Sequence, residues 1–278
     1  LLFLLVILAV IGYSAHEMVN QGKDEDYISV SVVVNDSSNV RWDAFRSGLE
    51  QGAEDNHVHL NLVSTGTFQN AQEEHTIVKR ELDGAKPVVL VGTGIETDRL
   101  FTSVMTDHGK LGKSLADAVI QGKAVKVGIL SGNQSQLGMR QRLKSVKDKL
   151  EEAGIEISWI LSEKELDKKM RNVEYFAEQP VDTVISLDND DTEKAVDIIL
   201  NDDRISWKLY GEGRSEKLIY YLDKGTIQEL AVPNEYYMGY QSIVLAAQNI
   251  RYYTDKTEQA EVEFYMVSKD NLYDEETS

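Results

Sequence analysis

Runs of β-branched apolar residues recur along the chain and alternate with segments that mix charged and apolar residues. YISVSVVV at 27–34 and KPVVLVGTG at 86–94 are examples of the first kind. Short apolar runs of this composition predict buried strands. The strands are expected at 27–34, 57–64, 86–94, 100–107, 124–131, 155–161, 182–187, 207–211, 227–232 and 261–268. Helices are expected at 40–55, 70–83, 109–121, 136–153, 164–176, 190–201, 214–224 and 235–253.

This regular alternation of strand and helix predicts an α/β fold with parallel sheets and helices on both faces. In such sheets, ligands bind at the carboxyl ends of the strands, on the loops that lead into helices. The loops of interest are therefore 35–40, 64–70, 92–98, 131–136, 188–190 and 211–214.

The first residues, LLFLLVILAVIGY, are apolar and carry no charge. Two interpretations stay open for them: the apolar core of a secretory signal peptide, or part of a transmembrane helix, which needs about 20 apolar residues. The small-residue cleavage site that a signal peptide requires is poor here, so the sequence favours an uncleaved anchor at 1–19. Residues 20–26 then form a polar linker, and the following domain lies on the extracytoplasmic face of the cell membrane.

The composition excludes several kinds of protein. The formal net charge of −18 argues against a nucleic-acid binder, because such proteins present a basic surface. The chain has no cysteine, which excludes disulfides, thiolate catalysis and cysteine-ligated zinc.

The segment VKVGILSGNQSQLGMRQR, from residue 125, has the strand, glycine turn and helix order of a phosphate-binding loop. It lacks the Gly-Lys-Ser/Thr ending of a P-loop, and GTG at 92–94 is only a fragment of a dinucleotide motif. The run at 188–191 lacks the spacing of a calcium loop, and the two histidines at 57 and 59 have no nearby partner for a metal. The sequence therefore predicts no enzyme activity, no metal and no cofactor.

Four longer segments carry a family resemblance. They are TDHGKLGKSLADAVI (106–120), GILSGNQSQLGMRQRLKSVKDKLEEAGIEI (128–157), DTVISLDNDDTEKAV (182–196) and YLDKGTIQELAVPNEYYMGYQSIVLA (221–246). Together they resemble the type I periplasmic binding proteins of the ribose- and galactose-binding kind. The resemblance extends from about Tyr27 to Ser268.

The resemblance implies two Rossmann-like lobes with parallel sheets, joined by a three-segment hinge, with the ligand between them. The first lobe is expected at 27–105 plus 236–268 and the second at 106–235, followed by a polar tail at 269–278. The crossings between the lobes are expected near 105–108, 232–236 and 264–268. Closure of such a hinge couples ligand binding to a change of shape.

The same resemblance implies a set of ligand-binding residues. Side-chain amides, carboxylates and guanidinium groups bind hydroxyls, and an aromatic ring packs on a sugar face. The candidates are Asn35, Asp36, Ser37, Trp42, Thr93, Arg142, Asn189, Glu212 and Arg214. Each also has a structural interpretation, such as a helix cap, a core aromatic residue or a solvated arginine.

The chain departs from the family pattern at several sugar-binding positions. Gly213 stands where the family has an aspartate, Pro233 where it has a glutamine, and Ser145 where it has a glycine. About one βα unit of the family pattern is also missing around 84–86. These departures put a plain pentose or hexose ligand in doubt.

Two functional hypotheses follow from the sequence. The first is a membrane-tethered binding protein that closes on a small polar, sugar-like ligand and signals or delivers it to a sensor histidine kinase or an ABC permease. The alternative is a degenerate binding domain that acts only as a protein-interaction module.

Overall fold

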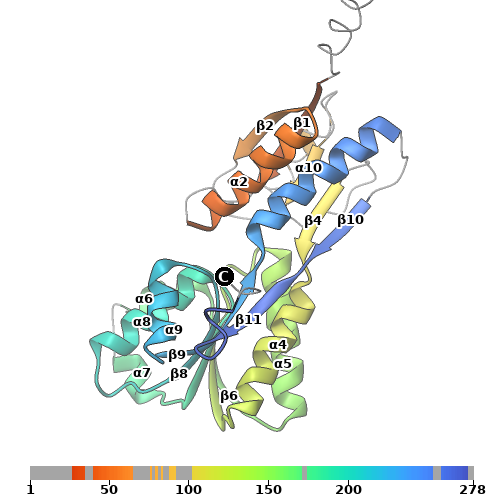
Figure 1. Ribbon diagram of the computed structural model, residues 1–278. Helices are drawn as coiled ribbons and strands as arrows, with labels where there is room; N and C mark the ends of the chain where they lie inside the picture. The colour runs from red at the N-terminus through yellow and green to blue at the C-terminus, as the bar shows by residue number, and fades with distance from the viewer. Residues whose placement is uncertain are drawn as a thin grey trace, which may run out of the picture.

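The protein folds into two α/β lobes that lie one above the other in Figure 1. The structure, a computed structural model, describes residues 27–34, 40–64, 76, 79–80, 83, 88–91, 102–170, 174–252 and 258–274.

Lobe 1 is a parallel sheet with α2 and α10 packed on one face (Figure 1). Its described strands follow the order β10-β4-β3-β1-β2. The elements are β1 (Ile28–Val34), α2 (Val40–Asp55), β2 (Val58–Ser64), β3 (Val88–Val91), β4 (Thr102–Thr106), α10 (Glu235–Tyr252) and β10 (Glu258–Val262). The helices approach closely because Gly48 and Gly52 of α2 lie against the backbone of Tyr236 and Tyr240. Any side chain at these glycines would displace α10.

Lobe 2 is a larger sheet with the described order β11-β9-β8-β7-β5-β6, covered by helices on both faces. Every neighbouring pair is parallel except β11 and β9. The first elements are α4 (His108–Gln121), β5 (Lys126–Leu130), α5 (Leu137–Glu152), β6 (Glu156–Leu161), α6 (Glu163–Met170) and α7 (Glu174–Glu178). The others are β7 (Thr183–Ser186), α8 (Asn189–Asn201), β8 (Lys208–Glu212), α9 (Glu216–Asp223), β9 (Ile227–Pro233) and β11 (Phe264–Ser268).

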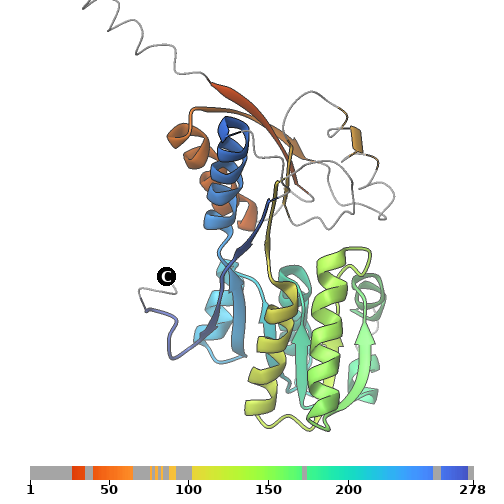
Figure 2. The ribbon, with the colours of Figure 1, turned by 90° about the vertical axis from the view of Figure 1, so that its right-hand side faces the viewer.

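The chain crosses between the lobes at Asp107, Asn234 and Glu263, where an element of one lobe is followed directly by an element of the other. Figure 2 shows these crossings as a narrow waist between the lobes. Two of the crossings are tied together, because the Asn234 N–H donates to the carbonyl of Glu263 at 3.2 Å. Lys110 of α4 also reaches across the waist to Glu261 of β10, with 2.9 Å between Nζ and Oε2.

The predicted strand 261–268 is wrong in one respect. It is two strands in different sheets: β10 pairs with β4 in lobe 1, and β11 pairs with β9 in lobe 2. The crossing lies at Glu263, next to the predicted 264–268, but β11 belongs with lobe 2 instead of lobe 1. The stretch EVEFYMVS contains no glycine, proline or other turn signal at this point, so the pattern along the chain does not mark the change of sheet.

Other predicted elements agree closely with the structure, and several lie outside it. Helix 40–55 has the predicted bounds, and the predicted helix 164–176 corresponds to α6 and α7. The predicted anchor at 1–19, the linker at 20–26 and the missing βα unit at 84–86 lie outside the described residues. No helix within the described ranges is long and apolar enough to cross a membrane.

Candidate functional site

The carboxyl ends of the parallel strands of lobe 2 point towards lobe 1, as the arrow of β6 shows in Figure 2, whereas β11 runs the other way. This end of the sheet is called the carboxyl end below. Most of the buried polar side chains described in lobe 2 lie at this end. They are Ser131, Arg142, Ser186, Asn189, Asp191, Thr192, Glu212 and Ser215.

Arg142 occupies the centre of this group. It lies on α5, and only 2% of its surface is exposed. Its Nε donates to Nδ1 of His108 at 3.0 Å, and its Nη1 donates to the carbonyl of Leu187 at 2.6 Å. Nη1 also lies 3.5 Å from Oε2 of Glu212, which is fully buried. The forked guanidinium can serve several acceptors at once, so one side chain joins α4, the β7–α8 loop and β8.

Asn189 begins α8 and is 5% exposed. Its Oδ1 accepts from the N–H of Arg214 at 3.2 Å, and its Nδ2 lies 3.3 Å from Oε1 of Glu193. Gly213 has a φ of 138°, and a Cβ there would overlap Oδ1 of Asn189. The structure thus explains why glycine stands at this position: a side chain would push Asn189 out of its place.

The carboxyl groups beside Asn189 are unusually basic. Burial, followed by the nearby charge of Asp191, raises the pKa of Asp188 to about 7, although the N–H of Asp191 opposes the shift. Burial also raises the pKa of Asp191 to about 6, against the opposing charge of Lys194. Asp188 caps α8, since its Oδ1 accepts from the N–H of Asp191 at 2.8 Å. A carboxyl group that titrates near neutral pH can either donate or accept a hydrogen bond.

The structure brings three predicted residues together at the carboxyl end, namely Arg142, Asn189 and Glu212. Arg214 joins them through its backbone, while its side chain is exposed. Trp42 lies on α2, where it packs against Phe45 and the apolar core of lobe 1, with ring centroids 5.5 Å apart. The other candidates, Asn35, Asp36, Ser37 and Thr93, lie outside the described residues.

Sequence reasoning missed two contributors to this site. Nothing in the local sequence indicates that His108 belongs to the site, because its partner Arg142 is 34 residues away. Asp188 belongs to the acidic run at 188–191, whose sequence suggests only a calcium loop without the required spacing. Its burial, and hence its raised pKa, depends on the packing of neighbouring strands.

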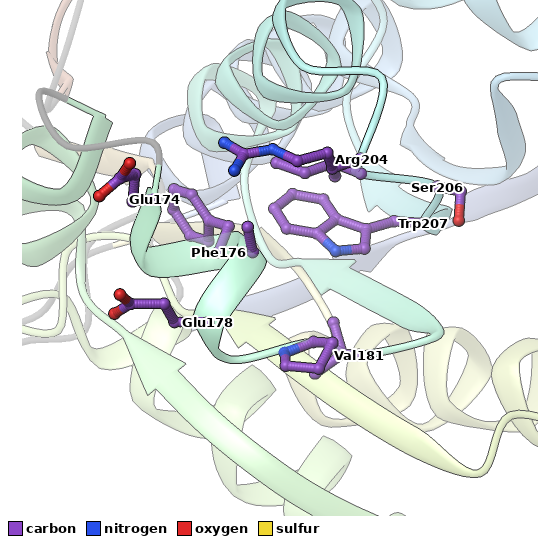
Figure 3. A pocket seen from close by; sticks show the side chains of 10 residues that line it. Glu174, Phe176, Glu178, Val181, Arg204, Ser206 and Trp207 are labelled. Atoms are coloured by element: carbon purple, nitrogen blue, oxygen red, sulfur yellow. The ribbon is translucent and has the colours of Figure 1, made fainter.

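A groove of about 470 Å³ lies at the opposite end of lobe 2, next to α7 and the amino ends of β7 and β8. Figure 3 shows residues that line it, with Phe176 and Trp207 side by side and Glu174, Glu178 and Arg204 around them. It shares no residue with the carboxyl end, so it is a separate feature of the surface.

Comparisons with known proteins agree with this architecture. A family model described as "Periplasmic binding protein domain" matches residues 77–253, which is more than half of the chain. No curated protein matches the chain.

Among solved structures, the glucose-galactose binding protein GanP from Geobacillus stearothermophilus is 18% identical, with a TM-score of 0.77 over 90% of this chain and 100% of its own. A carbohydrate transporter solute-binding protein from Agrobacterium radiobacter, in complex with D-arabinose, is 15% identical, with a TM-score of 0.79 over 91% and 98%.

The XylFII-LytSN complex also contains a similar chain, 12% identical, with a TM-score of 0.74 over 88% of this chain and 98% of the other. At these identities the structures show a shared fold alone, whereas the sequence match to the family model shows membership. The chain belongs to the periplasmic binding protein domain family.

Proposed function

We propose that the protein is an extracytoplasmic solute-binding protein that closes its two lobes on a small polar, sugar-like ligand. One observation carries this proposal: buried hydrogen-bonding groups gather at the carboxyl end of lobe 2, beside the waist that joins the lobes. Ligands of open α/β sheets bind at such ends, and three short crossings permit hinge closure. A binding protein of this kind performs no chemistry.

The chemistry of the carboxyl end favours a ligand that offers hydroxyl groups. The carboxyl of Asp188, with its pKa near 7, can accept from one hydroxyl or donate to another. On the lobe 1 side, the residues predicted to complete the site are Asn35, Asp36, Ser37, Trp42 and Thr93. The ligands named for the similar structures, glucose-galactose and D-arabinose, support a sugar as the first class to test.

The apolar run LLFLLVILAVIGY within the predicted anchor at 1–19 supports attachment to the membrane, with the binding lobes outside the cytoplasm. Closure would then be passed to a membrane partner, either a sensor histidine kinase or an ABC permease. A similar chain occurs in the two-protein XylFII-LytSN complex, which supports a protein partner in general.

A second function, a protein-interaction module without a small ligand, is favoured by a different observation. Arg142 and Asn189 already make hydrogen bonds within lobe 2, and Gly213 and Pro233 replace polar residues of the family pattern. Groups that are satisfied by the protein have less to offer a ligand.

A thermal-shift screen separates these functions. D-galactose, D-glucose, D-arabinose and D-fucose are added to the protein at up to 10 mM. A ligand present at 100 times its Kd stabilises the folded state by about 2.7 kcal/mol, so a true ligand raises the Tm by several degrees. The shift should disappear in Asn189→Ala and persist in Asn201→Ala, the same change at the exposed C-terminal end of α8.

If none of the four sugars raises the Tm, the sugar-binding proposal is overturned and the interaction module is favoured. If the shift survives in Asn189→Ala, sugar binding stands, but the carboxyl end of lobe 2 is not its site.

A further inference from the structure

Arg142 and Arg140 are two residues apart on α5 but have opposite surroundings. Arg140 is exposed, and its Nη1 donates to the carbonyls of Gln134 and Ser135, in the loop directly before α5. Arg142 is buried, and it contacts His108, Leu187 and Glu212, which belong to three other segments of the chain. The pair therefore offers a natural comparison between a local arginine and one that joins distant parts of the chain.

The partners of Arg142 stand next to residues that matter for closure and binding. His108 follows the crossing residue Asp107 directly. Leu187 precedes Asp188 and Asn189, which start α8, and Glu212 precedes Gly213. A displacement of the Arg142 guanidinium would thus alter contacts beside one crossing of the waist and in two loops of the carboxyl end.

The packing around these contacts leaves little freedom for adjustment. A Cβ on Gly112 of α4 would lie 2.6 Å from the carbonyl oxygen of Arg142. A Cβ on Gly138 of α5 would collide with the ring of His108. Because α4 and α5 touch through these two glycines, there is little space for the start of α4 to shift relative to Arg142.

We propose that Arg142 is a positioning residue that couples the ligand-facing loops of lobe 2 to the crossing at Asp107. The Nε–His108 bond fixes the first turn of α4, while Nη1 holds the Leu187 carbonyl and the Glu212 carboxylate. This role differs from the direct ligand contact that the family resemblance implies for Arg142. The ligand-facing part of the inference rests on the proposed function, but the coupling itself can be measured without a ligand.

Hydrogen exchange of the ligand-free protein tests the local part. In Arg142→Met, the backbone amides of Lys110, Asp191 and Arg214 should exchange at least tenfold faster, because each is bonded to a cap or loop that Arg142 holds. Amides at the other end of the sheet, which bond to the carboxylate of Asp182, should not change. The matched control Arg140→Met should not change the exchange rates of these three amides.

If exchange rises equally over the whole of lobe 2, Arg142 is merely part of the core and the proposal fails. It also fails if the three amides are unchanged. Should Arg142→Met not fold, Arg142→Lys gives the same information. It keeps the charge beside Glu212 but loses the fork, so exchange should still rise near Lys110 and Asp191.

Distances between the lobes test the coupling to the hinge. The chain has no cysteine, so spin labels attach only where Glu50→Cys and Lys168→Cys place them, at exposed positions in lobes 1 and 2. Arg142→Met should shift or broaden the distance distribution between the labels. Leu150→Ala, which removes a fully buried apolar side chain from the same helix, should not.

An unchanged distribution in Arg142→Met, or the same change in Leu150→Ala, would overturn the coupling. Both experiments use the protein without ligand, so their outcome is separate from that of the sugar screen. A protein that binds none of the four sugars can still show the coupling, and in that case only the proposed function falls.

Discussion

The two ends of the lobe 2 sheet are stabilised in opposite ways. At the carboxyl end, buried charged groups such as Arg142 and Glu212 hold loops together. At the amino end, Phe176 and Trp207 meet with ring centroids 5.3 Å apart, and Trp159 lies within 6.0 Å of both. One sheet thus has an apolar, strongly packed end and a polar end whose stability depends on protonation and hydrogen bonds.

This difference shows where function can be placed in the lobe. Burying charges contributes less stability than apolar packing of the same volume, because the charges lose their hydration. Buried charges can be tolerated at the polar end because the aromatic cluster at the other end, and the sheet between the two ends, stabilise the folded lobe. The two ends should therefore respond differently to mutation.

The largest effect is expected at the aromatic end. Phe176→Ala removes a side chain that is 1% exposed and leaves a cavity between Trp159 and Trp207. The free energy of unfolding should fall by about 3–5 kcal/mol, measured by urea denaturation. The exchange rates at Asp191 and Arg214 should keep their native values under conditions where the protein stays folded. A loss below 1 kcal/mol would show that the aromatic cluster is not the main support.

An intermediate effect, dependent on pH, is expected at Asp188. The pKa of this carboxyl is about 7 in the folded protein and 3.8 in the unfolded chain, so the folded state binds the extra proton between these values. Its contribution to stability is present below about pH 4 and is lost as the pH rises through about 7. Asp188→Asn keeps the cap on α8 and removes the charge.

This variant should therefore be more stable than the wild type at pH 8, by about 1–3 kcal/mol, and similar to it at pH 4, because one pKa unit corresponds to about 1.4 kcal/mol. Urea denaturation at pH 4, 6 and 8 measures the difference. The alternative, equal stability of the two proteins at pH 8, would mean that water reaches Asp188 and relieves its charge.

The smallest effect is expected at the cap of α9, also at the carboxyl end. The hydroxyl of Ser215 accepts from the N–H of Leu218 at 3.3 Å, and the residue is 7% exposed. Ser215→Ala should lower the free energy of unfolding by about 0.5–2 kcal/mol, whereas Ser215→Asp, which can also cap, should lower it less. If both variants lower the free energy of unfolding by the same amount, the effect comes from packing of the Ser215 side chain and not from capping.

Much of the fold could be predicted from the sequence, because its elements are encoded locally. Helix 40–55 and strand 155–161 are within one residue of the structure at each end. The exception is the last strand, which β10 and β11 divide between two sheets at Glu263. Nothing in the local pattern distinguishes an apolar strand that stays in one sheet from one that passes to another.

The candidate site could be predicted only in part. The sequence predicts Arg142, Asn189 and Glu212 as separate candidates, and the structure places them at one end of one sheet. Their partners were not visible, since Arg142 reaches His108 and Leu187 over 34 and 45 residues. Ligand contacts of these residues stay a prediction.

The sequence by itself determined the α/β class, the order of the described elements and the end of the lobe 2 sheet at which polar loops collect. These properties follow from the period of apolar residues and from turn residues, which act over a few positions. Only the tertiary structure decided that β11 leaves lobe 1, that Asp188 has a pKa near 7 and that Arg142 is buried among three elements. Strand pairing, desolvation and long-range hydrogen bonds depend on which distant segments meet, and that information is absent from any single stretch of the chain.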